Sequence, residues 1–256
     1  MKIDIICPLY NAESYLIDLN NSLMMQKKVD IKSINYILTE SKDNTEKILK
    51  DNKIDYTKIK TSEFSHSLTR ENAAMKCNGD ILVFITQDVK IEDELWLYNL
   101  TKNIGKNGIV AAYSRQITKY NNIEKYTREF NYSDKSFVVS KDDINEKGLK
   151  TFFFSDASSA VKTSTFKKLN GYDNKNLPIN EDMYLAYKLI MNDYKIAYEA
   201  DSIVLHSHNF KLKEIYDRYK LTGKFFKEND YLDKYDTNGS GASLAKYILK
   251  RAFQDF

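Results

Sequence analysis

Residues 79–88 read GDILVFITQD: a Gly-Asp turn, five consecutive apolar residues from Ile81 to Ile85, and a polar loop that ends at Asp88. An apolar run of this length between turn residues predicts a buried strand. In sheets whose strands alternate with helices, ligands bind beyond the carboxyl ends of the strands. The loop that ends at Asp88 is therefore the first place to search for a functional site.

The same kind of apolar run recurs on both sides of this stretch. Further strands are predicted at Lys2 to Cys7, Ser33 to Leu38, Ile109 to Tyr113, Thr151 to Ser155 and Ile203 to His206. Between the first two, Leu16, Leu19 and Leu23 recur every three or four residues, which is the period of a helix. This β-α-β-α order predicts an α/β fold with a mostly parallel central sheet and helices on both of its faces.

The composition excludes several classes of protein. The 256 residues carry 39 basic and 36 acidic side chains, so the net charge of +3 implies no nucleic-acid partner. The N-terminal apolar run is too short for a secretory signal, and no later run approaches the length of a membrane span. We expect a cytoplasmic protein whose Cys7 and Cys77 are reduced core residues.

Common nucleotide and hydrolase motifs are missing from the sequence. There is no GxxxxGKS, no GxGxxG after the first strand, no GxSxG and no HExxH, and the chain has only eight glycines. A nucleotide diphosphate would therefore have to be held by a metal ion and basic side chains.

Several motifs, taken in order, resemble the inverting family 2 glycosyltransferases of GT-A fold. They are Cys7-Pro8-Leu9-Tyr10-Asn11, Arg70 with Asn72-Ala73, Gly79 to Phe84 leading to Asp88, and Glu181-Asp182. Within that family, four runs look most like bacterial rhamnosyltransferases of surface-polysaccharide synthesis: His66 to Arg70, Thr86-Gln87-Asp88, Ser114-Arg115-Gln116 and His206-Ser207-His208.

The resemblance implies a division of the chain and a reaction. A GT-A catalytic domain would cover residues 1–210, with a donor-binding half at about 1–115 and an acceptor half at about 116–210, followed by helices over 211–256. The expected reaction transfers L-rhamnose from dTDP-rhamnose to a hydroxyl of a polysaccharide or lipid-linked oligosaccharide. Two alternatives stay open: a UDP-hexose or amino-sugar transferase of the same fold, and a non-catalytic glycan-binding or assembly subunit.

A divalent metal, Mn²⁺ or Mg²⁺, is expected at Asp88, because a carboxylate at the sheet rim can bind a hard cation that also holds diphosphate oxygens. The family usually has Asp-x-Asp here, whereas this chain has Thr86 in the first acidic position. His206 and His208 are two residues apart at a strand end, so both can face the same side, and the resemblance implies that one of them completes the metal shell.

The expected catalytic base is Asp182, which would take the proton of the attacking hydroxyl while Glu181 orients the acceptor or neighbouring groups. Asn180 is a good helix N-cap, and nearby helix amides should keep Asp182 ionised. Simple helix capping would explain the same residues.

The remaining site residues are assigned to the substrates. Pro8, Tyr10 and Asn11 would frame the base and ribose pocket, with Glu40 and Gln87 as further nucleotide contacts. Arg70, helped by Lys42, would neutralise the diphosphate, because a guanidinium offers two parallel donors to phosphate. The substrate contacts are expected at Asp156, Arg115 and Gln116, and Trp96 is expected in the core.

From Lys211 onward the pattern is helical and charged. Leu244, Tyr247 and Ile248 form an apolar stripe beside Lys246 and Lys250. Such a helix can pack on the catalytic domain, pair in a homodimer, or lie on the inner face of an anionic membrane. The first two explanations are favoured over peripheral membrane binding, which a liposome flotation test would detect.

Overall fold

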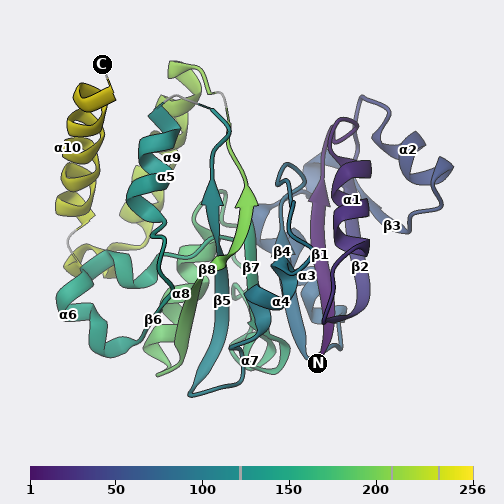
Figure 1. Cartoon of the computed structure of the whole chain (residues 1–256), viewed down its shortest axis with the longest axis horizontal. Helices are drawn as coiled ribbons and strands as arrows, with labels where there is room; N and C mark the ends of the chain where they lie inside the picture. The colour runs from purple at the N-terminus through teal and green to yellow at the C-terminus, as the bar shows by residue number, and fades with distance from the viewer. Residues whose placement is uncertain (121–122, 209, 236, 256) are drawn as a thin grey trace.

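The computed structural model describes residues 1–120, 123–208, 210–235 and 237–255, and their strands form one eight-stranded sheet (Figure 1). The strand order is β3-β2-β1-β4-β7-β5-β8-β6. The strands are β1 (Lys2–Leu9), β2 (Asp30–Thr39), β3 (Tyr56–Ile59), β4 (Ile81–Ile85), β5 (Ile109–Ile117), β6 (Phe137–Val139), β7 (Ser158–Lys162) and β8 (Lys195–Leu205). Residues 121, 122, 209, 236 and 256, which the expected domain ranges include, lie outside the described residues.

Most strands of the sheet run in one direction. β1 pairs in parallel with β2 and β4, β2 with β3, and β5 with β8. β7 lies antiparallel between β4 and β5, which therefore share a direction, and β6 is antiparallel to β8 at the edge. The carboxyl ends of the parallel strands thus lie along one rim, and the prediction of a mostly parallel sheet is confirmed.

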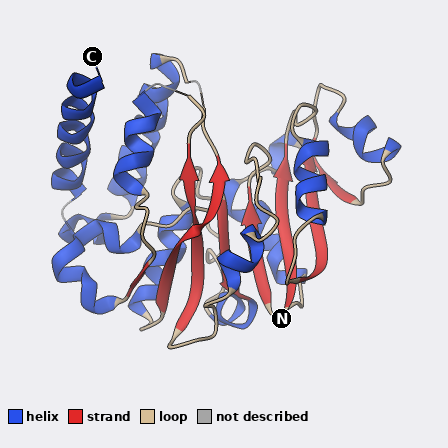
Figure 2. Ribbon diagram, viewed as in Figure 1, coloured by secondary structure: helices blue, strands red, loops and turns tan. Residues whose placement is uncertain are grey.

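Helices cover both faces of the sheet, as expected (Figure 2). The helices are α1 (Leu16–Met24), α2 (Thr45–Asp51), α3 (His66–Lys76), α4 (Trp96–Thr101), α5 (Ile123–Asn131), α6 (Ile144–Lys147), α7 (Thr163–Lys168), α8 (Glu181–Met191), α9 (Leu212–Glu228) and α10 (Thr237–Asp255). Short 3₁₀ turns cover Thr61–Glu63, Lys141–Asp143, Gly148–Phe152 and Asp230–Tyr235. One core cluster includes residues of α1 and α4, and the other includes residues of α3, α7 and α8. Trp96 is fully buried in the first of these clusters, as predicted.

The predicted strand at Thr151 to Ser155 is wrong. Residues Gly148–Phe152 form a 3₁₀ turn, and the strand β7 begins only at Ser158. Phe152 and Phe154 are nevertheless buried at 0% and 3% exposure. The aromatic run therefore signals burial from an irregular segment, which periodicity cannot distinguish from a short buried strand.

The C-terminal helix α10 packs on α5, which confirms packing on the rest of the chain, the first of the three explanations for its apolar stripe. The rings of Phe130 on α5 and Tyr247 on α10 lie 5.2 Å apart, and Arg251 pairs with Glu129 at 3.2 Å. Figure 1 shows α10 and α5 at the end of the sheet opposite α1 and α2. Across the described residues, no helix is both long and apolar enough to cross a membrane.

Candidate active site

The loops after β1, β2 and β4 are tied together by side-chain hydrogen bonds to backbone groups. Gln87 accepts a hydrogen bond from the Tyr10 N–H at 2.7 Å and donates one to the Tyr10 carbonyl at 2.8 Å. Asn11, at φ 48°, donates through its N–H to Ser41 Oγ and accepts from the Lys42 N–H. Three polar loops therefore meet at one rim of the sheet.

The expected nucleotide contacts differ in whether their side chains are available to a ligand. Tyr10 is 46% exposed at the rim, and Glu40 is an exposed residue just beyond the end of β2. Pro8 lies within β1, beyond Ile6 where pairing with β4 ends, so its missing N–H breaks no bond to that strand. Gln87 uses both ends of its amide on Tyr10 and acts here by holding the loop.

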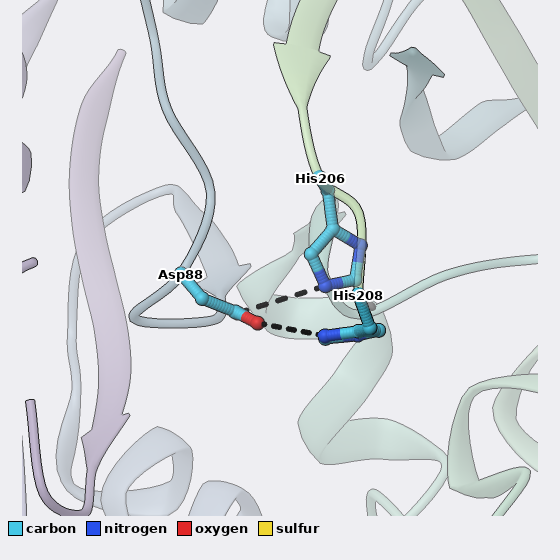
Figure 3. Close-up of side chains that lie close together, drawn as sticks. All are labelled: Asp88, His206 and His208. Atoms are coloured by element: carbon cyan, nitrogen blue, oxygen red, sulfur yellow. Dashed lines mark ion pairs between the residues drawn. The ribbon is translucent and has the colours of Figure 1, made fainter. Parts of the chain in front are cut away.

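Asp88, His206 and His208 come together at the rim, from the loop after β4 and from the end of β8 (Figure 3). Asp88 Oδ1 lies 3.6 Å from His206 Nε2, and Asp88 Oδ2 lies 3.4 Å from His208 Nδ1. The three candidate ligand atoms all lie within 4.8 Å of one another. Both histidines, rather than one of them, are therefore placed to hold an ion with Asp88.

The contact with Gln116 determines which nitrogen of a neutral His206 can bind a metal ion. Gln116 Oε1 accepts from the guanidinium of Arg128, which can only donate, so this atom must be the amide oxygen. His206 Nδ1 lies 2.8 Å from the same oxygen and must therefore carry a hydrogen. In the neutral ring this leaves the lone pair on Nε2, the atom that faces Asp88.

The pKa shifts of Asp88 and His208 also suit a cation. Burial raises the pKa of Asp88, but the hydrogen bond and charge of a protonated His206, with the charge of His208, outweigh it and hold the pKa well below its usual range. Burial lowers the pKa of His208. An ionised carboxylate and neutral imidazoles are the forms that bind metals.

Asp182 lies in the first turn of α8 and accepts hydrogen bonds from the N–H groups of Met183, at 2.8 Å, and Asp156, at 3.3 Å. Burial, followed by the charges of Glu181 and Asp156, nevertheless raises its pKa well above the ordinary value. The two amides therefore do not dominate the pKa of Asp182, contrary to the expectation, because desolvation and two neighbouring carboxyl groups outweigh them.

Asn180 does not cap α8 with its side chain, which corrects a second expectation. Its backbone is left-handed, at φ 58° and ψ 27°, and its side chain accepts no bond from the first turn. A capping residue normally has an extended backbone, which aims its side chain at those amides. Nδ2 of Asn180 is instead buried with no partner among the described residues.

Arg70 and Asp156 lie beneath the site. Arg70 is 3% exposed, and its Nη1 donates to Glu181 Oε1 at 3.2 Å and to the His66 carbonyl at 2.8 Å. Asp156 is 1% exposed, and its two oxygens accept from Ser159 and Tyr172 at 2.7 and 2.5 Å. In this arrangement Arg70 balances the charge of Glu181, and neither side chain presents a polar group to solvent.

Arg218 on α9 was missed by the sequence reasoning. Its guanidinium lies 5.1 Å from the ring of Phe210, whose centroid is 4.5 Å from that of His208. Burial is the main cause of the lowered pKa of His66, about 4, and of His208, and the charge of Arg218 contributes to both. Arg218 is exposed and forms no ion pair within the described part of the chain.

A cavity of about 370 Å³ joins these parts of the site. Its lining includes His206 and His208, Gln116, Arg218 and Asn180, the residue before Glu181. Two of the three expected metal ligands, His206 and His208, and the start of the helix that carries the expected base thus border one space. Arg115, at the end of β5, instead lines a different cavity.

Comparison with known proteins agrees with this geometry. Residues 4–169 match the family described as glycosyl transferase family 2. The O-antigen chain rhamnosyltransferase RfbN of Salmonella typhimurium is 34% identical over 252 residues, which cover 97% of this chain and 79% of that protein. The O-antigen chain rhamnosyltransferase WbaN of Salmonella anatum is 33% identical over 193 residues, or 74% of this chain and 61% of that one.

Solved structures show the same fold at low sequence identity. The mannosyltransferase PcManGT of Pyrobaculum calidifontis, in complex with GDP-Man and Mn²⁺, has a TM-score of 0.65 and 15% identity, covering 98% of this chain and 75% of that one. TarS of S. aureus has a TM-score of 0.62 and 19% identity, and the match covers 80% of this chain but only 36% of TarS. The family match and the rhamnosyltransferase relatives together show that this chain belongs to glycosyl transferase family 2 and is a glycosyltransferase of GT-A fold.

Proposed function

We propose that the protein transfers L-rhamnose from dTDP-rhamnose to a hydroxyl group of a cell-surface polysaccharide or lipid-linked oligosaccharide, with inversion at the anomeric carbon. The observation that carries the proposal is the cavity bordered by His206, His208 and Asn180, because it joins a candidate cation group to the helix of Asp182. The choice of rhamnose is supported by the names of two relatives at 34% and 33% identity.

In this mechanism Asp182 is the general base. Its carboxylate takes the proton of the acceptor hydroxyl as that oxygen bonds to the anomeric carbon, and the bond to the nucleoside diphosphate breaks on the opposite side. A carboxylate with a raised pKa is the stronger base for this step. Glu181 acts as a positioning residue, since its ion pair with Arg70 fixes the first turn of α8.

Asp88, His206 and His208 would hold the divalent ion, with His206 oriented by Gln116. Bound there, the ion supplies positive charge that stabilises the departing diphosphate. Imidazole ligands suit Mn²⁺ better than Mg²⁺, which prefers all-oxygen shells with several waters. We therefore expect Mn²⁺ to support binding at lower concentrations than Mg²⁺.

Arg218 takes the role that the sequence assigned to Arg70, that of the guanidinium at the diphosphate. It is exposed, has no ion-pair partner among the described residues, and lines the cavity with the two histidines. A hydrogen bond to a charged group contributes about 1.5–3 kcal/mol. Arg218→Ala should therefore weaken binding of a nucleoside diphosphate by roughly 10- to 150-fold.

The same variant should change the affinity for the nucleoside monophosphate much less, because that ligand lacks the second phosphate. Both affinities can be measured by calorimetry in the presence of Mn²⁺. Lys220→Ala, which removes a cation from the same helix outside the cavity lining, is the matched control. Equal losses for diphosphate and monophosphate would remove Arg218 from the leaving-group site.

The donor is tested by thermal stabilisation with dTDP, UDP and GDP, each with and without Mn²⁺ or Mg²⁺, since a ligand that binds only the native state raises its stability. A metal-dependent shift with dTDP supports the rhamnosyl donor. A shift with UDP alone favours a UDP-hexose or amino-sugar transferase of the same fold. No shift with any nucleotide would contradict the proposed donor chemistry and favour a non-catalytic role.

A further inference from the structure

A second cavity, of about 430 Å³, lies against the end of β5 and the first turns of α5. Four cationic side chains line it: Arg115, Lys119, Lys125 and Arg128. Glu129 is the single acidic residue in the described lining. The cavity adjoins the space bordered by the two histidines, with which it shares Gln116 and Arg128. It also adjoins a larger cavity at Asp88 and His208, with which it shares Lys119 and Tyr120.

Two of the four cationic side chains that line this cavity already have an acidic partner. Lys125 pairs with Asp255 at 2.9 Å, and Arg128 pairs with Glu124 at 2.9 Å. The charge of Glu129 is balanced by Arg251 at 3.2 Å and is not available to the cavity. Within the described ranges, Arg115 and Lys119 form no ion pair, so the wall keeps two uncompensated positive charges.

Arg115 is the stronger indication of a ligand. Its side chain is half-buried at the end of β5, and its Nε is covered with no hydrogen-bond partner among the described residues. A charge withdrawn from water without a partner is costly, so a guanidinium in this position is normally matched by a carboxylate or phosphate. No such partner comes from the described protein atoms, which favours an anion supplied from outside.

The position of the cavity indicates which substrate carries the anion. The donor diphosphate is expected at Asp88, on the other side of His206 from Gln116. Tyr132 lines the second cavity; burial raises its pKa to about 12, and the nearby charge of Asp182 adds to this. Gln116, which also lines this cavity, donates from Nε2 to Ser155 Oγ at 2.8 Å, and the N–H of the next residue, Asp156, donates to Asp182 at 3.3 Å. The cavity is thus close to the proposed base.

We propose that this cavity binds an anionic group of the acceptor, held mainly by Arg115 and Lys119. The inference rests on the proposed function and narrows it to acceptors that carry a phosphate or a carboxylate near the attacking hydroxyl. A phosphate-linked carrier and an acidic sugar share this chemistry, and a guanidinium can bind either in two-pronged fashion.

The first test uses inorganic pyrophosphate as the probe, with EDTA present so that no divalent ion can hold it at Asp88. The background is Arg218→Ala, which removes the unpaired guanidinium from the cavity bordered by the two histidines. Pyrophosphate should raise the melting temperature of this protein, and the rise should disappear when Arg115→Met is added. Lys47→Met, on α2 at the other end of the sheet, is the matched control and should keep the rise.

The proposed site would be contradicted if pyrophosphate still raised the melting temperature after Arg115→Met. It would also be contradicted if pyrophosphate caused no rise in the Arg218→Ala protein. The second test compares KM for a phosphorylated, a uronic-acid and a neutral saccharide acceptor. Arg115→Met should raise KM at least 10-fold for an acidic acceptor and change KM for the neutral acceptor much less.

Preference for the phosphorylated acceptor would identify a phosphate-linked carrier, and preference for the uronic acid would identify an acidic sugar. Equal KM values for neutral and acidic acceptors in the wild type would contradict the proposal. Absence of donor hydrolysis by the wild-type protein would instead contradict the proposed function. The pyrophosphate test does not depend on donor hydrolysis and would still decide whether the anion site exists.

Discussion

The two halves of the sheet rim differ in how well their polar groups are satisfied. On the side of β1, β2 and β4, the loops are joined by complete hydrogen-bond pairs such as Gln87 with Tyr10. On the side of β5, α8 and α9, Arg115 and Arg218 form no ion pair among the described residues, and Nδ2 of Asn180 is a buried donor without a partner. Two buried hydroxyls of the first half, those of Thr39 and Thr86, lack a partner among the described residues, whereas the second half leaves a guanidinium and an amide donor without one next to the expected reaction.

This difference has a physical meaning. Unpaired buried polar groups and crowded carboxylates lower stability, and proteins keep them where a substrate or reaction step compensates for the cost. Glu181, Asp182 and Asp156 are three carboxyl groups served by one buried guanidinium, that of Arg70. We therefore expect substitutions on this side to separate activity from stability, and substitutions on the other side to lower both.

The largest expected effect is that of Asp182→Asn. Removal of the base should lower the transfer rate by about 10²- to 10⁴-fold, while donor binding stays nearly unchanged. The same change should stabilise the protein at neutral pH, because it removes one of the crowded carboxylates. Each kcal/mol gained raises the melting temperature of a chain of this size by about 2–4 °C.

The stabilisation should depend on pH with a defined sign. Since the folded pKa of Asp182 is raised, the wild type loses stability as the pH rises through that value, and the asparagine variant does not. Below about pH 4, where an aspartate is protonated in the unfolded chain as well, the difference should vanish. Melting curves across pH test this, with Asp201→Asn at an exposed position as the control. Retained turnover would remove Asp182 from the role of base.

The second effect concerns Gln116, which borders both cavities and orients His206. Gln116→Leu removes the acceptor for His206 Nδ1 and should weaken Mn²⁺ binding by about 10- to 100-fold, the usual cost of losing a group that orients a metal ligand. Mn²⁺ titration followed by electron paramagnetic resonance measures this without turnover.

Gln116→Glu keeps an acceptor for both His206 and Arg128 and should restore most of the Mn²⁺ affinity. A role in packing alone would not be rescued by this charged substitution. Unchanged Mn²⁺ affinity in Gln116→Leu would mean that His206 needs no orienting partner, and the contrast between the two halves would then rest on charge alone.

The sequence predicted those features that depend on local pattern. The apolar run at Ile81 to Ile85 became β4 with the same bounds, and the spacing of His206 and His208 placed both near Asp88. The spacing alone could not decide how the two histidines share the ion. The bond from His206 to Gln116 joins residues 90 positions apart and depends on the pairing of β5 with β8.

The features that the sequence did not predict depend on packing. Nothing local distinguishes the buried Arg70 from the exposed Arg218, yet the fold puts one under Glu181 and the other beside His208. The residue type at Asn180 suits an N-cap, but its left-handed backbone turns the side chain away from that role. The sequence therefore could not predict that Arg70 is buried or that Asn180 does not cap α8, because both depend on how the fold packs.

The smallest expected effect lies on the side of β1, β2 and β4. Gln87→Ala removes two hydrogen bonds to the Tyr10 backbone, each worth about 1 kcal/mol at most because water can replace them at this partly exposed position. The melting temperature should fall by a few degrees at every pH, since no titrating group is involved. Gln87→Glu keeps the acceptor for the Tyr10 N–H and should lose about half as much. Stabilisation by Gln87→Ala, of the kind expected for Asp182→Asn, would mean that the side of β1, β2 and β4 also gives up stability for the substrate. The proposed difference between the two halves of the rim would then be wrong.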